Sequence, residues 1–344
     1  MMTIDRYGTV AIDESTFPDP LMRVIVRESW DTDRDGVLSE GERRRVTQFL
    51  FDGDNYDDPL RSVQGIEYAP YLRELTVRHT PLESLDVSHN ARLEYLCATD
   101  CGLGSLDVSH NPRIVGLYVD GNDLARLDTS DNPDLAYLYA GGNRLRSLDT
   151  SRNPQLVKLE VPDNALVRCD LSENCELTDL NVRGNRLSTL DLSRNRQLTE
   201  LDVSGNCLGS LDLSCNPELV YMHADNNRLD SLDVSRNTKL TELWAGGNRI
   251  GSCDVSRNGE LISLSLRDNR LCACDVSHNG KLVELNVSGN QLRSLDLSHN
   301  ADLEYLFVRH NELRGLDLSH NNALVEVLAD GNPGFTGAAS PVAP

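Results

Sequence analysis

Aromatic side chains are scarce in this sequence, and this limits the kind of core that it can form. Phe, Trp and Tyr make up 5% of the 344 residues, whereas hydrophobic residues of all kinds make up 39%. A single irregular core uses bulky rings of varied shape, but aliphatic side chains such as Leu and Val suit many identical small slots. The composition therefore favours a repetitive chain over several ordinary globular domains.

Basic residues are also few compared with acidic ones. The chain has 33 Lys and Arg against 54 Asp and Glu, which gives a formal net charge of -21. Such a chain repels phosphate backbones, so we expect no nucleic-acid partner. No apolar run is long enough to span a bilayer, so we expect no membrane insertion. The first twenty residues lack the apolar segment of a signal peptide, so we expect a cytosolic protein or a mature or trimmed form.

Several familiar chemical motifs are missing. The nine cysteines include no CxxC pair, which argues against a zinc ribbon or a thioredoxin-like site. The sequence also lacks a GxSxG elbow, a phosphate-binding loop, an HExxH motif and a dinucleotide fingerprint. We therefore expect that the protein is not an enzyme.

The sequence repeats one phrase, a variant of LDVSHN, every 21 residues. Asp follows the first position in all twelve copies, Ser stands two places further on, and Asn closes the phrase. The first position is Leu85, Leu106, Leu127, Leu148, Cys169, Leu190, Leu211, Leu232, Cys253, Cys274, Leu295 and Leu316. Because neighbouring Asp residues repel one another and the calcium-binding GGxGxD repeat is absent, a structural turn role is favoured over a metal-binding column. We expect Cys253 and Cys274 to be reduced and buried in the core slot that they share.

The other half of each unit has the pattern L-x-x-L-x-V-x-x-N-x-L, as in LVKLEVPDNAL at 156–166. Alternation in this segment predicts a strand whose Leu and Val point inward, and stacked coils would bury that face. We expect thirteen such strands, from Glu74–Arg78 to Glu326–Asp330, with a second short strand at LDV. The Asn columns are interpreted as hydrogen-bonding partners for turn backbone groups.

These motifs resemble the bacterial leucine-rich repeat of 21 residues, the internalin-J-like type, over residues 60 to 332. The resemblance implies a leucine-rich-repeat solenoid, with a parallel β-sheet of 13 coils on its concave face, over residues 53–332. It also implies export to a bacterial surface. The sequence departs from the type at Val161, Val182 and Ala245, where that type often has Cys, so a continuous cysteine column is not expected.

The stretch DTDRDGVLSEGE at 31–42 matches the calcium loop of an EF-hand. Asp31, Asp33 and Asp35 supply carboxylates, Gly36 makes the sharp turn, and Val37 offers its carbonyl. Ser39 contributes, usually through water, and Glu42 is the bidentate carboxylate. We therefore expect one Ca²⁺; the alternative is a loop that no longer binds metal.

No second calcium loop follows, so we expect the single one to pack on the repeat. Internalin-like proteins carry an EF-hand-like helical cap before their repeats, and the resemblance implies such a cap over residues 17–52. A strand is expected at 46–51. The remaining segments, 1–16 and 333–344, are interpreted as an N-terminal and a flexible C-terminal tail.

The concave face is the expected binding surface, since exposed aromatic side chains on a rigid sheet are typical interface anchors. The expected partner-binding residues are Tyr95, Tyr118, Tyr137, Tyr139, Tyr221, His223, Trp244, Tyr305 and Phe307. Acidic residues lie between them, at Asp120, Glu160, Asp179, Glu200, Asp202 and Asp225. We expect a monomer that binds a protein there. The alternatives are a glycan-binding surface module, which would stack sugars on the same rings, and a cytosolic interaction scaffold.

Overall fold

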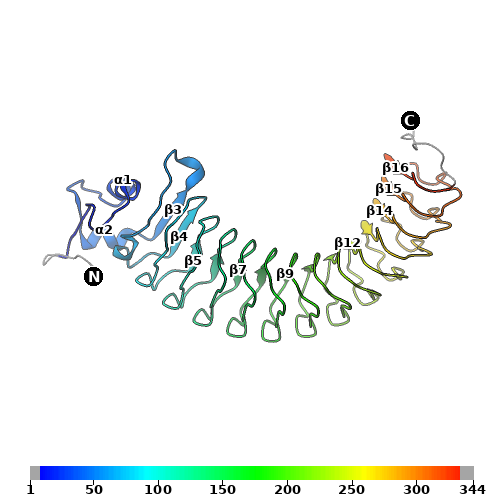
Figure 1. Cartoon of the computed structure of the whole chain (residues 1–344), viewed down its shortest axis with the longest axis horizontal. Coiled ribbons are helices and arrows are strands. Elements are labelled where there is room, and N and C mark those ends of the chain that lie inside the picture. Colours follow the sequence, from blue (N-terminus) through cyan, green and yellow to red (C-terminus); the bar gives the residue numbers. More distant parts are fainter. Residues whose placement is uncertain (1–7, 334–344) are drawn as a thin grey trace. The chain divides into compact units, whose positions relative to one another are not determined.

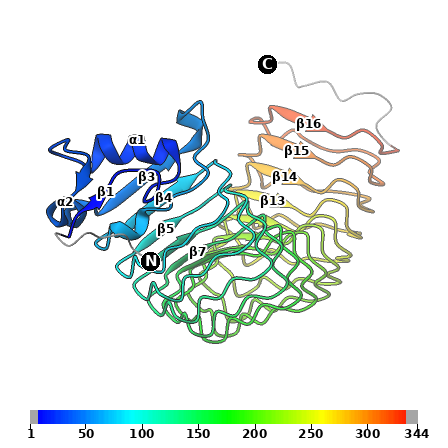
Figure 2. The same ribbon diagram turned by 60° about the vertical axis from the view of Figure 1, so that its left-hand side comes forward.

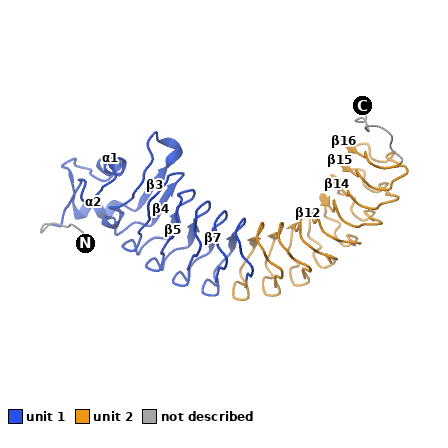
Figure 3. Ribbon diagram, viewed as in Figure 1, with its two compact units in different colours: residues 1–169 blue, residues 170–344 orange. Residues whose placement is uncertain are grey.

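The computed structural model describes residues 8–333, so residues 1–7 and nearly all of the expected C-terminal tail lie outside the described residues. The chain divides into two compact units, residues 1–169 and 170–344 (Figure 3). Within the described residues, no helix is long and apolar enough to cross a membrane.

Unit 1 contains two short helices, α1 (Pro20–Ser29) and α2 (Glu40–Arg45). The side chain of Asp19 accepts hydrogen bonds from the backbone N–H groups of Leu21 and Met22, and Pro20 opens α1. Ser39 and Glu42 form a reciprocal capping box at the start of α2. Short 3₁₀ turns follow at Gly53–Asn55 and Ile66–Tyr68. Each helix therefore begins where its capping residue stands in the sequence.

A strand from the expected N-terminal tail completes this part of unit 1. β1 (Val10–Ala11) pairs antiparallel with β2 (Val37–Leu38), and Val10 is fully buried. Aromatic contacts join α1 to β3 (Gln48–Asp52): the ring of Trp30 lies 6.2 Å from Phe17 and 6.1 Å from Phe49. Figures 1 and 2 show α1 beside β3. These rings form a small core of their own, next to the first strand of the repeat sheet.

The repeat strands of unit 1 continue the sheet that β3 starts. They are parallel and follow chain order, and partners in the repeats stand 21 residues apart, as in Leu96, Leu117 and Leu138. These strands are β4 (Glu74–Arg78), β5 (Tyr95–Cys97), β6 (Gly116–Tyr118), β7 (Tyr137–Tyr139) and β8 (Lys158–Glu160). The strand expected at 46–51 is thus confirmed as β3, which pairs with β4.

Unit 2 has the same construction. The strands are parallel, in chain order and in register, as in Leu201, Met222 and Leu243. They are β9 (Asp179–Asn181), β10 (Glu200–Asp202), β11 (Tyr221–His223), β12 (Glu242–Trp244), β13 (Ser263–Ser265), β14 (Glu284–Asn286), β15 (Tyr305–Phe307) and β16 (Glu326–Leu328). The expected strand positions, β4 to β16, are confirmed in both units, and the fold is a leucine-rich-repeat solenoid.

The second strand expected at LDV is largely wrong. Among the described residues, the pairing at this position is a single bridge between Asp86 and Asp107. Asp side chains here bond the turn instead: Asp212 Oδ1 accepts from the N–H of Ser214 at 2.9 Å. The hydroxyl and the N–H of Ser214 together lower the pKa of Asp212. The expected turn role of the Asp column is therefore confirmed, because each carboxylate serves its own turn.

Buried Asn side chains tie each coil to the one before it. Asn216, in the first column, donates from Nδ2 to the carbonyls of Leu192 at 3.1 Å and Asn195 at 2.8 Å. In the second column, Asn206 accepts from the N–H of Leu187 at 3.0 Å and donates to the carbonyl of Val182 at 2.9 Å. The structural role expected for both columns is confirmed, since they satisfy backbone groups that the turns bury.

Replacing one of these side chains should weaken the whole stack. In Asn216→Ala, the carbonyls of Leu192 and Asn195 each lose one donor and keep one backbone N–H donor. The unfolding free energy is therefore expected to fall by about 1–3 kcal/mol, at about 0.5–1.5 kcal/mol for each hydrogen bond lost. The midpoint of urea unfolding measures this. Arg236→Ala, an exposed change one coil later, is the control and should shift the midpoint little. Equal midpoints for the two variants would show that the Asn216 side chain does not stabilise the stack.

The cysteines test the register of the coils. Cys253 and Cys274 form no disulfide and are only partly buried, so the expectation that both are buried is wrong in part. Burial still raises the pKa of both thiols to about 12. Their thiols should react with maleimide at pH 8 on the order of 100-fold more slowly than the exposed Cys175 and Cys272, because the thiolate is the nucleophile. Mass spectrometry resolves the sites, and denatured protein provides the reference rates. Equal rates in the native protein would mean that Cys253 and Cys274 face outward. A shift of the register by one residue would have that effect.

Candidate functional site

The loop at 31–42 brings three carboxylates together. One oxygen each from Asp31, Asp33 and Asp35 lies within 4.8 Å of the other two. Asp31 accepts from the N–H of Asp35 at 3.2 Å and of Gly36 at 3.0 Å, and Asp35 accepts from the N–H of Val37 at 2.9 Å. Gly36 has a φ of 84°, which suits a residue without Cβ. The loop is therefore folded around its carboxylates, with oxygen donors that a hard cation prefers.

Glu42 ends the loop and is buried. Its Oε2 accepts from the N–H of Ser39 at 2.9 Å and the Ser39 hydroxyl at 2.8 Å, and its Oε1 accepts from the N–H of Thr32 at 2.7 Å. Burial alone would raise the pKa of Glu42, but the hydrogen bonds from Ser39 and Thr32 lower it to about 2. Burial and the charges of Asp35, Glu42 and Asp31 raise the pKa of Asp33. The carboxylates thus repel one another, and a bound cation would relieve that repulsion.

The loop at 31–42 has a partner strand. β1 pairs with β2 inside the loop, since Val10 pairs with Leu38 and Ala11 pairs with Val37. The N–H of Ile12 also bonds to the carbonyl of Gly36 at 3.1 Å. This pairing has no signal in the sequence, because two residues carry too little pattern to predict a strand.

The aromatic residues expected to bind a partner all lie on the strands β5 to β7, β11, β12 and β15, at positions that alternate with buried Leu or Met. We call this outward surface of the strands the strand face. The most exposed rings are Tyr95 at 42%, Tyr137 at 38%, Tyr221 at 45%, Trp244 at 36% and Tyr305 at 37%. The half-buried ones are Tyr118, Tyr139, His223 and Phe307.

In unit 1, four tyrosines lie on the three adjacent strands β5, β6 and β7. The rings of Tyr118 and Tyr139 are stacked, with centroids 5.0 Å apart. Gly116 stands on β6 between Tyr95 and Tyr137, and a Cβ there would lie 2.8 Å from Tyr95 and 2.9 Å from Tyr118. The missing side chain therefore lets the rings approach one another. Lys158 lies on the next strand, with its Nζ 5.9 Å from the centroid of Tyr139.

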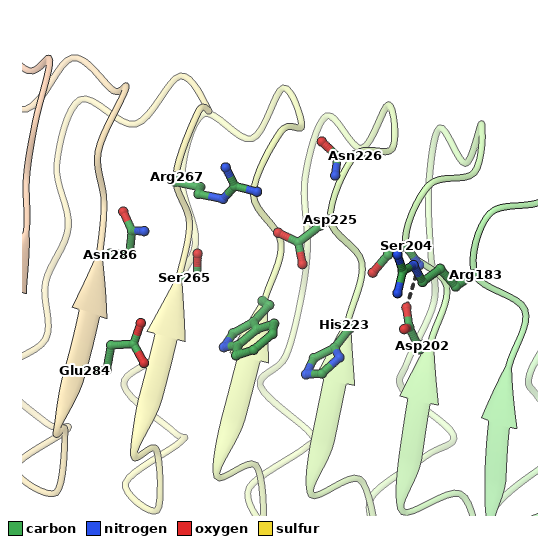
Figure 4. Close-up of a pocket in the computed structure, with 11 residues that line it drawn as sticks. Arg183, Asp202, Ser204, His223, Asp225, Asn226, Ser265, Arg267, Glu284 and Asn286 are labelled. Carbon is green, nitrogen blue, oxygen red and sulfur yellow. Dashed lines mark hydrogen bonds between the residues drawn. The ribbon is translucent and has the colours of Figure 1, made fainter. Parts of the chain in front are cut away.

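In unit 2, the rings of His223 and Trp244 are stacked, with centroids 4.4 Å apart and planes 8° apart. The indole N–H of Trp244 donates to the hydroxyl of Ser263 at 3.0 Å, and His223 Nε2 lies 2.5 Å from a carboxylate oxygen of Glu242. These rings line a pocket of about 390 Å³ (Figure 4). Its other charged residues are Arg183, Asp202, Asp225, Arg267 and Glu284.

The two ring stacks occupy equivalent positions in their units. His223 and Trp244 each stand 105 residues, a multiple of the repeat, after Tyr118 and Tyr139. A partly buried Asp stands two residues after the first ring of each stack: Asp120 accepts from the N–H of Gly141 at 2.7 Å, and Asp225 accepts from the N–H of Gly246 at 2.9 Å.

Burial raises the pKa of both of these carboxyl groups, Asp120 and Asp225. Their sequence positions place both among the surface acids of the strand face, but each hydrogen-bonds the coil that follows it. A sequence signal for the shared arrangement exists, because AGGN stands at 140–143 and again at 245–248. The residues that the sequence pattern did not single out are Gly116, Lys158, Arg183, Ser263, Arg267 and Glu284.

No protein-family model and no curated protein sequence matches this chain. Among solved structures, the functional domain of InlJ from Listeria monocytogenes, which includes a cysteine ladder, is similar over 96% of this chain and 78% of that one. The TM-score is 0.85 and the sequence identity 28%. The internalin InlF from Listeria monocytogenes is similar over 94% of this chain and 92% of that one, with a TM-score of 0.76 and 20% identity. The resemblance to internalin-type repeats is thereby confirmed.

A more distant similarity is to a receptor in a complex. The plant peptide hormone receptor RGFR1, solved in complex with RGF2, is similar over 85% of this chain and 60% of that one. The TM-score is 0.66 and the identity 18%. At this level of identity the similarity concerns the fold alone.

Proposed function

Because its structural neighbours are internalin-type leucine-rich-repeat proteins, we propose that this chain is a protein-binding module whose partner docks on the strand face. The observation that carries this proposal is the pair of ring stacks, one in each unit, on outward positions of the strands. Aromatic rings that are held in place bind with little loss of conformational entropy. They are also the side chains most often found to dominate interface energies.

The negative charge of the chain favours a partner with basic residues. The chain carries a net charge of -21, and carboxylates of the strand face lie beside the rings, among them Glu160 on β8 and Asp202 on β10. Such a surface attracts a partner with basic residues and raises its association rate at low ionic strength. A neutral glycan would have no such dependence on salt, so the salt dependence of association separates that alternative.

The loop at 31–42 is proposed to bind one Ca²⁺ and so to stabilise the start of unit 1. Asp31, Asp33 and Asp35 would hold the ion together with the Val37 carbonyl, Ser39 and Glu42. The donor chemistry fits, because these groups offer only oxygen and the three carboxylates already converge. The bound ion would supply positive charge between carboxylates that otherwise repel one another. The role is structural, since the loop is joined through β2 and α2 to the aromatic core of the cap.

Removing two rings of unit 1 should abolish most of the binding. Tyr137→Ala plus Tyr139→Ala is expected to weaken the complex by about 2–4 kcal/mol, the range of interface hot spots. The folded state should change little, because neither ring fills the core. A pull-down from bacterial or host lysate supplies the partner, and calorimetric titration of the purified proteins measures the affinity.

The matched control is Arg126→Ala plus Arg152→Ala, two exposed changes outside the strands of the same unit. It should keep the affinity within about twofold, as neutral surface changes do. Loss of binding in the arginine pair with full binding in the tyrosine pair would move the interface off the strand face.

Calcium should bind with one ion per chain and stabilise the cap. At one hundred times the dissociation constant, the linkage contributes about 2.7 kcal/mol to the unit that binds. Calorimetry on chelator-treated protein measures the stoichiometry, and fluorescence of the buried Trp30 follows unfolding of the cap. Asp31→Ala and Glu42→Ala should lose the heat, whereas Glu40→Ala, an exposed residue of α2, should keep it. An unaltered heat in the first two variants would show that the ion binds elsewhere.

A further inference from the structure

The two ring stacks differ in their neighbours on the next strand along the chain. That strand is β8 for the stack that ends at Tyr139 and β13 for the stack that ends at Trp244. In unit 1, Tyr139 pairs in register with Tyr118 on one side and Glu160 on the other. The ammonium of Lys158 lies over the Tyr139 ring, and it also lies 3.4 Å from a carboxylate oxygen of Glu160. The chain thus places its own cation between an aromatic face and a carboxylate, which is a favourable position for an ammonium group.

In unit 2, the equivalent residues are short. Trp244 pairs with His223 on one side and Ser265 on the other, and Ser263 stands where unit 1 has Lys158. Neither serine can cover the indole ring, which remains 36% exposed and borders the pocket of about 390 Å³. The ring face that Lys158 covers in unit 1 is therefore open to solvent in unit 2, on the indole of Trp244.

The indole is held ready for a ligand on that face. Its N–H donates to Ser263, which fixes the orientation of the ring, and His223 stacks on the opposite face. The imidazole is in turn held by Glu242. An aromatic platform anchored in this way loses little conformational freedom when a group binds to it.

The charges around the pocket favour a cation over an anion. Three carboxylates, Asp202, Asp225 and Glu284, line it along with two guanidinium groups, Arg183 and Arg267. Arg267 Nη1 already lies 3.6 Å from a carboxylate oxygen of Asp268. Glu284 pairs in register with Ser263, on the strand beyond the exposed indole face, and Figure 4 shows Glu284 and Ser265 on neighbouring strands. Glu284 lies two strands from Trp244, whereas Glu160 lies on the strand next to Tyr139. Glu284 would thus offer a carboxylate to a longer, incoming ammonium side chain.

We propose that a lysine side chain of the protein partner lies on the exposed face of Trp244, with its ammonium toward Glu284, in the arrangement that Lys158 makes on Tyr139 in unit 1. This inference rests on the proposed function, because it names the chemistry that one part of the strand face recognises. Its basis is the chain's own duplicate, in which the same aromatic position is covered by a lysine.

The test uses the full chain, labelled with ¹⁵N, and the two indole N–H signals that its two tryptophans give. Trp244→Phe assigns the signals, and Trp30, which is buried in the cap, is the internal reference. The probe is acetyl-Gly-Lys-Gly-amide, titrated at constant ionic strength against the matched peptide with norleucine in place of lysine. We expect a saturable shift of the Trp244 signal with the lysine peptide, no shift of Trp30, and a much smaller effect of norleucine.

Two variants test the roles of the Glu284 carboxylate and of the exposed indole face. Glu284→Gln keeps the shape of the side chain and should weaken the lysine peptide several-fold, on the scale of about 2- to 30-fold that cation–aromatic and charge contacts give. Ser263→Lys plus Ser265→Glu copies the residues of unit 1 and should abolish the titration, because the chain's own ammonium then covers the indole. Circular dichroism checks that both variants are folded.

Equal shifts with the lysine and norleucine peptides would overturn the proposal, as would an unchanged affinity in Glu284→Gln. A response to a glutamate peptide or to maltotriose with none to lysine would overturn it as well, and would assign the pocket to an anion or a sugar. These outcomes leave the proposed function testable by itself, because the tyrosine pair of unit 1 reports partner binding without Trp244.

Discussion

Every coil of this protein depends on its neighbours to bury its leucines. A segment of 21 residues has an inward row of Leu and Val but nothing of its own to cover it, so the core exists only between stacked coils. The buried Asn columns make that stacking specific, since an Asn such as Asn206 bonds backbone groups of the coil before it as well as its own. An insertion of one residue would break these bonds and turn the inward row outward. This constraint explains why the spacing of the LDVS phrase never varies.

The same constraint leaves the strand face free to vary. Inward positions of the strands are almost all Leu, whereas the outward positions hold Tyr, Trp, His, Lys, Glu, Asp and Ser in changing order. Because the backbone beneath them is fixed, side chains on adjacent strands meet in register. Substitution at these positions therefore changes the chemistry of the surface without changing the fold. The two ring stacks, with different rings and different neighbours on one backbone arrangement, are an example within a single chain.

Much of the fold could be predicted from the sequence, because its causes are local and repeated twelve times. The strand positions follow from the alternation around Leu, and the turn roles of Asp and Asn follow from their fixed offsets. The pairing of β1 with β2 could not be predicted, since it joins two residues to a loop far along the chain. Nor could the burial of Asp120 and Asp225, or the closeness that Gly116 permits, because these depend on how side chains of adjacent coils meet. The residues of the strand face were thus found by position, while their contacts required the structure.

Hydroxyl-radical footprinting of the chain with and without its partner tests most directly whether the partner covers the strand face, as proposed. Aromatic side chains are readily oxidised, so the exposed rings report their own burial. If the partner covers that face, Tyr95, Tyr137 and Trp244 lose reactivity in the complex, while the similarly exposed Tyr56, which follows β3, keeps it. Protection of Tyr56, with the rings of the strand face as reactive as in the free protein, would contradict the proposal.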